Sequence, residues 1–185
     1  MSKKIKIEPC KNNVGAFIEI DLNFCNNSIF IEIEKAINKY GVLFFRNQNL
    51  SSKEYIKFAR NFGICADYPM LKGLDGFKEI TVVEKKPGEK IMFGEGWHTD
   101  STYTPHPPKF TMLYSIKTPK KGKGNTRFAS QYLSYASLDR NYKKKIKNVK
   151  NIFSANGPIS KTRNARTAEK GTGIDPKSLR AEHRI

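Results

Sequence analysis

Short apolar runs separated by polar, turn-forming residues constrain the fold of this chain more than any other feature. Residues 14–20, 42–45, 79–84 and 126–129 have the length and composition of β-strands. Residues 110–116 alternate apolar and polar side chains, as a strand does when one face of its sheet meets water. Because short strands dominate the middle of the sequence, we expect a mainly β barrel or sandwich with flanking helices.

Helical periodicity marks the segments between these runs. Residues 28–39, with an N-cap serine at the first position, have apolar side chains on one face, and Gly41 ends the expected helix. Ser51 and Glu54 form a capping-box pattern before a second helix, which stops at Gly63. The apolar side chains of both helices are expected to lie in the core.

The rest of the chain is more polar. Residues 131–150 indicate one helix, or two with Asp139 as the N-cap of the second. Residues 156–180 are rich in Gly, Ser, Thr and Lys, which is typical of a long loop or lid. A length of 185 residues suits one domain. We therefore expect a single domain over residues 1–185, with a loop or lid near its end.

Composition argues against several classes of protein. No apolar stretch approaches the length of a membrane-crossing helix, and the basic start is not followed by the apolar core of a signal peptide. Cys10, Cys25 and Cys65 are odd in number and form no Cys-x-x-Cys pair, so neither a disulfide framework nor a thiolate zinc site is indicated. We expect a cytoplasmic protein that does not bind membranes.

The formal net charge of +17 raises the question of a nucleic-acid partner. The densest basic run, residues 143–147, falls within an expected helix, where a solvated face is the commoner explanation. Lysine and asparagine are also frequent throughout the chain. We therefore attribute the charge to composition and expect no specific nucleic-acid partner.

The segment Gly96-Trp97-His98-Thr99-Asp100 has the sharpest chemical pattern. In an extended strand, residues two apart project from the same face, so the His98 imidazole and the Asp100 carboxylate can aim at one point. Such a pair supplies two of the three groups of the 2-His-1-carboxylate triad, which binds iron(II) and leaves positions open. On the spacing alone, a hydrogen-bonded surface pair is the simpler interpretation.

Four motifs place this pair in a wider context. They are GVLFFRNQ at 41–48, FARNFG at 58–63, WHTDSTY at 97–103 followed by Pro107-Pro108, and GNT at 124–126. Their order resembles that of the TauD/TfdA (taurine dioxygenase-like) family of iron(II)- and 2-oxoglutarate-dependent dioxygenases. Lys123 departs from the family pattern, since it stands in the place of the second glycine in Gly-Gly-Asp-Thr.

The resemblance implies both a fold and a chemistry. The fold is a distorted, jelly-roll-like double-stranded β-helix, which we expect to be incomplete at its C-terminal end. His98 and Asp100 would bind Fe(II), and Thr126 would donate a hydrogen bond to a 2-oxoglutarate carboxylate. Without the family, Thr126 is an ordinary strand residue. The implied reaction uses O2 and 2-oxoglutarate to hydroxylate a small organic substrate. Trp97 would be a core aromatic and His106 a loop residue.

Two parts of the family's site have no counterpart in this sequence: the second histidine ligand and an arginine that pairs with 2-oxoglutarate. His183 lies in a stretch that resembles a family segment before the distal ligand, so we do not expect it to bind iron. We therefore expect the chain to be truncated and inactive as it stands.

The substrate is the least defined expectation. The stretches around Tyr68-Pro69 and Gly94-Glu95 do not reproduce the histidine, tyrosine and asparagine of the taurine pocket, which argues against taurine. Besides a small-molecule substrate, the expected partners include another copy of the chain, in a homo-oligomer. The alternative function is a non-catalytic basic protein that binds nucleic acid or another polyanion and retains a relic of the dioxygenase fold.

Overall fold

The computed structural model describes residues 5–85, 87, 88, 94, 96–157 and 171–184. The chain divides into two compact units, residues 1–63 with 113–139 and residues 64–112 with 140–185. Of the predicted loop or lid at 156–180, residues 158–170 lie outside the described residues.

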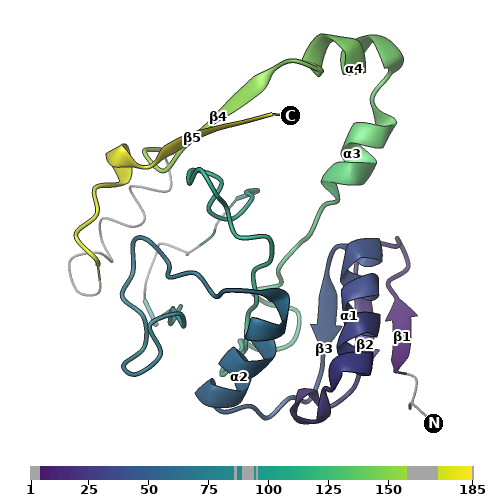
Figure 1. Ribbon diagram of the computed structural model, residues 1–185, viewed down its shortest axis with the longest axis vertical. Coiled ribbons are helices and arrows are strands. Elements are labelled where there is room, and N and C mark those ends of the chain that lie inside the picture. The colour runs from purple at the N-terminus through teal and green to yellow at the C-terminus, as the bar shows by residue number, and fades with distance from the viewer. Residues whose placement is uncertain (1–4, 86, 89–93, 95, 158–170, 185) are drawn as a thin grey trace. The chain divides into compact units, whose positions relative to one another are not determined.

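The first unit contains a three-stranded sheet in the order β1 (Lys6–Pro9), β2 (Ala16–Glu19), β3 (Leu43–Phe45) (Figure 1). β1 pairs antiparallel with β2, and β2 pairs parallel with β3. A parallel pair requires a crossover connection, and the helix α1 (Asn27–Tyr40) provides it. The predicted strands at 14–20 and 42–45 are thereby confirmed, with shorter bounds.

The helix α1 has the predicted apolar face and the predicted end. Ile33 and Ala36 are buried, and Gly41 adopts the left-handed conformation, φ 75°, that ends the helix. The predicted N-cap was wrong. Asn26 caps the helix, because its side-chain oxygen accepts from the Ile29 amide at 3.0 Å, whereas Ser28 donates its hydroxyl to the same oxygen at 2.8 Å.

The helix α2 (Ser52–Ala59) begins with the predicted capping box. The Ser51 amide donates to Glu54 at 2.7 Å, and the Glu54 amide donates to the Ser51 hydroxyl at 3.3 Å. A 3-10 turn, η2 (Arg60–Phe62), continues the helix to Gly63. Phe58 is buried and stacks edge-on against Phe62 at 5.7 Å between ring centroids, so these aromatics belong to the core as predicted.

Three predicted strands do not form, at 79–84, 110–116 and 126–129. Local alternation gives a segment the right side chains, but a strand also needs a partner for its backbone. Residues 110–116 still show the expected alternation, since Phe110, Met112 and Tyr114 are half-buried between exposed neighbours. The described residues thus form two small sheets with helices, rather than a mainly β structure.

The predicted helical stretch 131–150 becomes two helices, α3 (Gln131–Ser137) and α4 (Arg140–Ile146), with the restart directly after Asp139. The second unit then forms an antiparallel pair that the sequence did not indicate, β4 (Lys150–Ser154) with β5 (Arg180–Arg184). The remaining 3-10 turns are η1 (Leu22–Phe24) and η3 (Pro176–Ser178). None of the described helices combines the length and apolarity that a membrane span requires.

The core of the second unit is small. It consists of three buried side chains, Met70, Tyr103 and Ala155, with three half-buried ones packed against them, Tyr68, Phe153 and Leu179. Phe153 belongs to β4, Ala155 directly follows β4, and Leu179 directly precedes β5, so the strand pair lies on one side of this core. The segment after Asp100 supplies Tyr103. This arrangement anchors the backbone that follows the predicted metal ligands.

Candidate metal centre

The structure brings His98 and Asp100 together. His98 Nε2 lies 3.1 Å from Asp100 Oδ1. The prediction that the two residues lie in a strand was wrong. They lie in an irregular segment that turns at Asp100. The side chains are 39% and 48% exposed, which leaves room for further ligands on the pair.

The backbone before His98 fixes the orientation of its ring. His98 Nδ1 lies 2.9 Å from the Gly96 carbonyl oxygen, and a carbonyl can only accept, so Nδ1 carries the proton. Nε2, which faces Asp100, is then the nitrogen that can bind a metal ion when it carries no proton. Gly94 lies beside the same ring, since a Cβ at that position would be 3.4 Å from His98 Cε1. Sequence reasoning did not single out these glycines as supports, although glycine just before a ligand is the signal for a close backbone approach.

The geometry of the pair fits a divalent metal ion. Two ligand atoms that each lie about 2.1 Å from the ion and subtend about 90° are about 3.0 Å apart. The distance between His98 Nε2 and Asp100 Oδ1, 3.1 Å, matches this spacing. A lone pair and a carboxylate facing each other also need a positive charge, which a proton on Nε2 or a shared cation supplies. One nitrogen and one oxygen ligand suit Fe(II).

A complete set of protein ligands is not found in the described part of the chain, where no group of three His, Cys, Asp or Glu side chains could hold an ion. His106 is exposed in its loop, as predicted. His183 Nε2 is directed at two carbonyl oxygens, those of Thr102 and Thr104. His183 is therefore a structural residue in this arrangement and not a third ligand.

The segment after Asp100 is tightly turned. Ser101 has φ 52°, and its carbonyl accepts from the Thr104 amide at 3.0 Å and the Thr104 hydroxyl at 2.8 Å. Tyr103 points into the core and lies 3.4 Å from the Tyr68 hydroxyl. Burial raises the pKa of the Tyr103 phenol, and the nearby charge of Asp100 also raises it, while a hydrogen bond with Ser101 lowers it. A neutral, buried phenol thus anchors the turn.

Thr126 lies in an exposed, irregular segment of the first unit, whereas His98 and Asp100 belong to the second, and its contact with 2-oxoglutarate stays a prediction. Trp97 is 71% exposed, and the prediction that it is a core aromatic was wrong.

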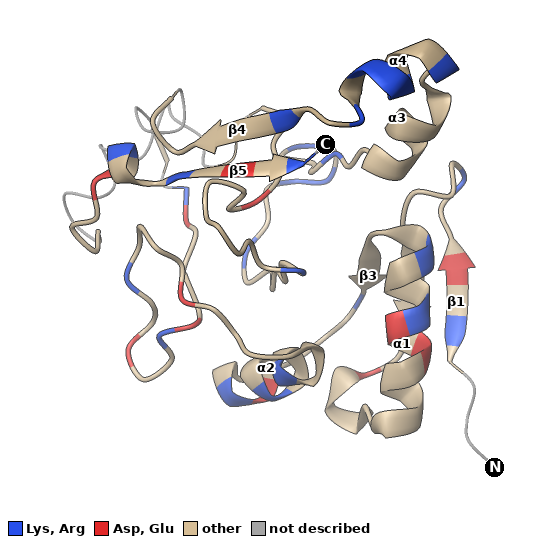
Figure 2. Cartoon of the chain, turned by 45° about the horizontal axis from the view of Figure 1, so that its top comes forward, with Lys and Arg blue, Asp and Glu red and all other residues tan. Residues whose placement is uncertain are grey.

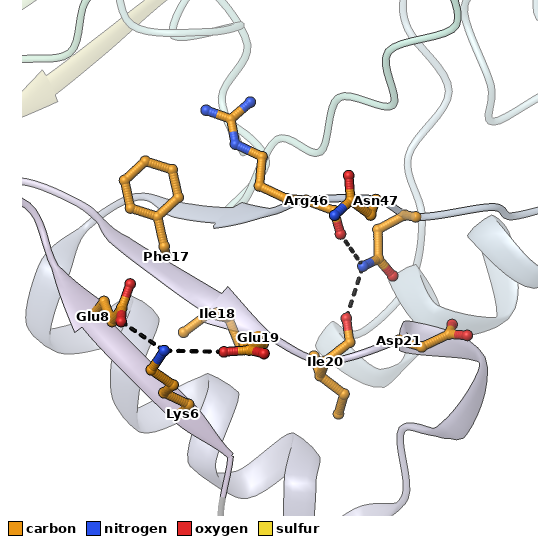
Figure 3. Close-up of a pocket in the computed structure, with 10 residues that line it drawn as sticks. Lys6, Glu8, Phe17, Ile18, Glu19, Ile20, Asp21, Arg46 and Asn47 are labelled. Atoms are coloured by element: carbon orange, nitrogen blue, oxygen red, sulfur yellow. Dashed lines mark hydrogen bonds and ion pairs between the residues drawn. The ribbon is translucent and has the colours of Figure 1, made fainter.

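A pocket of about 460 Å³ in the first unit contains none of the predicted site residues (Figure 3). Its polar groups are already used to hold the sheet together. Lys6 forms ion pairs with Glu8 and Glu19 at 2.8 and 3.2 Å. Gln48 donates to the carbonyl oxygens of Ile20 and Arg46, both at 2.7 Å. The candidate site is the pair His98 and Asp100, called the metal pair below, and not this pocket.

Comparison with known proteins assigns this sequence to a family. The sequence matches the family described as "Taurine catabolism dioxygenase TauD, TfdA family" over residues 6–180. An alkylsulfatase of Acinetobacter baylyi is 32% identical over 140 residues, which are 74% of this chain and 43% of that protein. An (S)-phenoxypropionate/alpha-ketoglutarate-dioxygenase of Sphingobium herbicidovorans is 28% identical over 154 residues, 80% of this chain and 53% of that protein. The chain spans about half the length of these relatives.

Solved structures agree on the fold. AAD-2, crystallised with Mn(II) and N-oxalylglycine, aligns with a TM-score of 0.64 at 22% identity, covering 98% of this chain and 64% of that one. A taurine dioxygenase from Burkholderia xenovorans aligns with a TM-score of 0.57 at 17% identity, covering 99% and 77%. The family match extends over almost the whole chain and includes the His98–Asp100 segment. The chain therefore belongs to the TauD/TfdA family of 2-oxoglutarate-dependent dioxygenases.

Proposed function

We propose that this protein is an Fe(II)- and 2-oxoglutarate-dependent dioxygenase that hydroxylates a small organic substrate. The observation that carries the proposal is the 3.1 Å approach of His98 Nε2 to Asp100 Oδ1 within a chain of this family. The proposed fold of the whole protein is the double-stranded β-helix that the resemblance implies, with the described sheets as parts of it.

Each residue of the pair has a defined role in this proposal. His98 would bind the ion through Nε2, because its other nitrogen is occupied by the Gly96 carbonyl. Such a bond to the second nitrogen fixes the ring and makes the first nitrogen a better ligand. Asp100 would bind through Oδ1 and supply negative charge. When bound, Fe(II) would supply the redox chemistry that couples O2 and 2-oxoglutarate to oxidation of a C–H bond.

Thr126 is the proposed contact to 2-oxoglutarate, through a hydrogen bond from its hydroxyl to a carboxylate. The described residues supply two ligands to the metal, so we propose that these residues alone hold Fe(II) weakly and do not support turnover. Among the relatives, four are named for phenoxy acids and one as a sulfate ester dioxygenase. We therefore propose a small organic anion as the substrate class.

Metal binding tests the proposal directly. Mn(II) would be titrated into the isotope-labelled chain while the amide signals of residues 96–104 are followed by NMR, because a paramagnetic ion broadens signals near its site even when it binds weakly. We expect broadening centred on His98 and Asp100, and at least about tenfold weaker binding in His98→Ala and Asp100→Ala. His106→Ala is the matched control, since it removes an exposed histidine of the same unit. Unchanged broadening in His98→Ala would falsify the assignment.

A further inference from the structure

We propose that His183 is a positioning residue for the metal pair, because it ties strand β5 to the backbone that directly follows Asp100. The effect on metal binding rests on the proposed function, but the contact between His183 and this backbone does not depend on a metal. His183 lies 83 positions after Asp100 in sequence and is the only histidine besides His98 with a described contact to this segment.

The contact is a shared hydrogen bond. His183 Nε2 lies 2.8 Å from the Thr102 carbonyl oxygen and 3.2 Å from that of Thr104. Both partners can only accept, so Nε2 carries a proton and donates to the two carbonyls. The ring is half-buried, where such a bond is exchanged less easily for one to water. A single N–H group thus clamps two alternate residues of the turn.

The clamped turn is continuous with Asp100. The left-handed conformation of Ser101 costs free energy and persists only when its surroundings hold it. The Thr104 amide and hydroxyl hold the Ser101 carbonyl from one side, and Tyr103 is buried in the core. The bond from His183 to Thr102 and Thr104 closes the turn from the other side, and so limits where the Asp100 carboxylate can lie.

The other end of the clamp is well anchored. His183 is paired with Asn151 in the β4–β5 ladder, and its ring packs against Phe153 with 5.7 Å between centroids. Next to it, Ala181 is buried, and the Ala155 amide donates to the Leu179 carbonyl at 3.0 Å. The strand pair therefore acts as a fixed support, and His183 transmits its position to the turn.

Three substitutions separate this role from general support of the fold. His183→Ala removes the N–H donor. His183→Gln keeps an N–H donor near the position of Nε2 while removing the ring. Asn151→Ala changes the opposite residue of the same ladder pair, whose side chain is exposed. Positioning by the hydrogen bond predicts a defect in His183→Ala, rescue in His183→Gln and no effect in Asn151→Ala.

The first measurement needs no metal. Amide hydrogen exchange of Thr104, whose N–H group bonds the Ser101 carbonyl, reports how often the turn opens. We expect exchange about tenfold faster in His183→Ala, the effect of losing one part-buried hydrogen bond, and near the original rate in the other two variants. Equal exchange rates in all four proteins overturn the inference, as does an acceleration in His183→Gln as large as that in His183→Ala.

The second measurement links the turn to the metal pair. Mn(II) broadening at the Thr99 amide should require several-fold more Mn(II) in His183→Ala than in His183→Gln or Asn151→Ala. If exchange accelerates but Mn(II) broadening is unchanged, His183 holds the turn without positioning the ligands, and the inference fails. If the unsubstituted chain shows no broadening near His98, the proposed function fails instead, and the exchange data still decide whether His183 controls the turn.

Discussion

Glycine lets the backbone before His98 come close to the imidazole. Gly94 and Gly96 have φ values of 74° and 90°, which L residues with side chains rarely adopt. Gly96 turns its carbonyl toward His98 Nδ1, and Gly94 lies beside the Cε1 atom of the ring. The position of the metal-binding nitrogen thus depends on residues that carry no functional group.

Gly94→Ala should weaken metal binding. The added Cβ would lie 3.4 Å from His98 Cε1 and 3.8 Å from Nε2, in van der Waals contact with the ring, so it would occupy space beside the ligand nitrogen. We expect Mn(II) binding to weaken by about threefold to tenfold, the range for disturbed support of a ligand. The Mn(II) titration described above would measure the change.

Gly88→Ala is the control for backbone strain. Gly88 also has a positive φ, 83°, but a Cβ there meets no atom within 4 Å. Both substitutions should therefore carry a similar strain of about 1 kcal/mol, and only Gly94→Ala should alter metal binding. Equal Mn(II) binding in the two variants would show that the Cβ contact with His98 is unimportant.

For single residues, the sequence predicted which side chains come together better than it predicted how exposed a side chain is. The pairing of His98 with Asp100 was predicted, because two ligand types two positions apart in a known motif leave few alternatives. The exposure of Trp97 was not, because burial depends on what the rest of the fold places over a side chain. The supporting roles of Gly94, Gly96 and His183 depend on backbone conformation and long-range contacts, which the sequence does not state.

The capping box of α2 is an element whose stability should depend on pH. Hydrogen bonds from the Ser51 side chain and backbone lower the pKa of Glu54 below its ordinary value of 4.5, with a smaller contribution from Lys57. A lowered folded-state pKa means that the ionised carboxylate stabilises the fold. This stabilisation is fully present above pH 4.5 and is lost as the pH falls through the lower folded-state pKa.

Glu54→Gln should remove this pH dependence. Glutamine can still accept from the Ser51 backbone, as capping boxes with glutamine do, but it cannot be protonated. We expect the free energy of unfolding of Glu54→Gln to be lower than that of the original chain at pH 7, with the difference shrinking toward pH 3. Denaturant unfolding followed by circular dichroism at a series of pH values would measure it. A difference that is constant over this pH range would contradict the role of the ionised carboxylate.

The packing of α1 predicts a larger change in the free energy of unfolding. Ile33 is fully buried in the first unit, so Ile33→Ala removes apolar contacts and leaves a cavity. We expect a loss of about 2 to 4 kcal/mol in the free energy of unfolding. Ile31→Ala is a matched control in the same helix, because Ile31 is 50% exposed, and it should cost less than about 1 kcal/mol. Similar costs in the two variants would contradict the described orientation of the helix.

Elements with local signals were predicted, and elements that depend on distant partners were not. The capping box and Gly41 set the ends of α2 and α1 through contacts within a few residues. The β4–β5 pair joins Lys150–Ser154 to Arg180–Arg184, and neither segment has a marked apolar alternation. Conversely, residues 79–84 have the composition of a strand but no partner strand in the described structure.

At the scale of the whole molecule, positive charge is distributed rather than gathered. Figure 2 shows Lys and Arg on α1, α2 and α4 and on both strands β4 and β5, that is, in both units. Several of the lysines are paired with carboxylates, among them Lys78 with Asp67 at 3.5 Å and Lys150 with Glu182 at 3.7 Å. A net charge of +17 that is spread over elements of both units among the described residues favours weak, nonspecific attraction to polyanions.

Binding to duplex DNA distinguishes the enzyme from the alternative of a basic binding protein. If the charge is compositional, we expect weak binding that does not depend on DNA sequence and disappears between about 50 and 200 mM salt, as counterion release requires. Replacing Lys143, Lys144 and Lys145 of α4 with glutamine should then weaken binding no more than replacing three exposed loop lysines, Lys120, Lys121 and Lys123. Each triple variant removes three charges, so a diffuse charge makes the two equivalent. Fluorescence anisotropy with duplexes of different sequence would measure both. Selective binding at 150 mM salt that only the α4 variant abolishes would instead identify α4 as a nucleic-acid site and favour the binding protein over the dioxygenase.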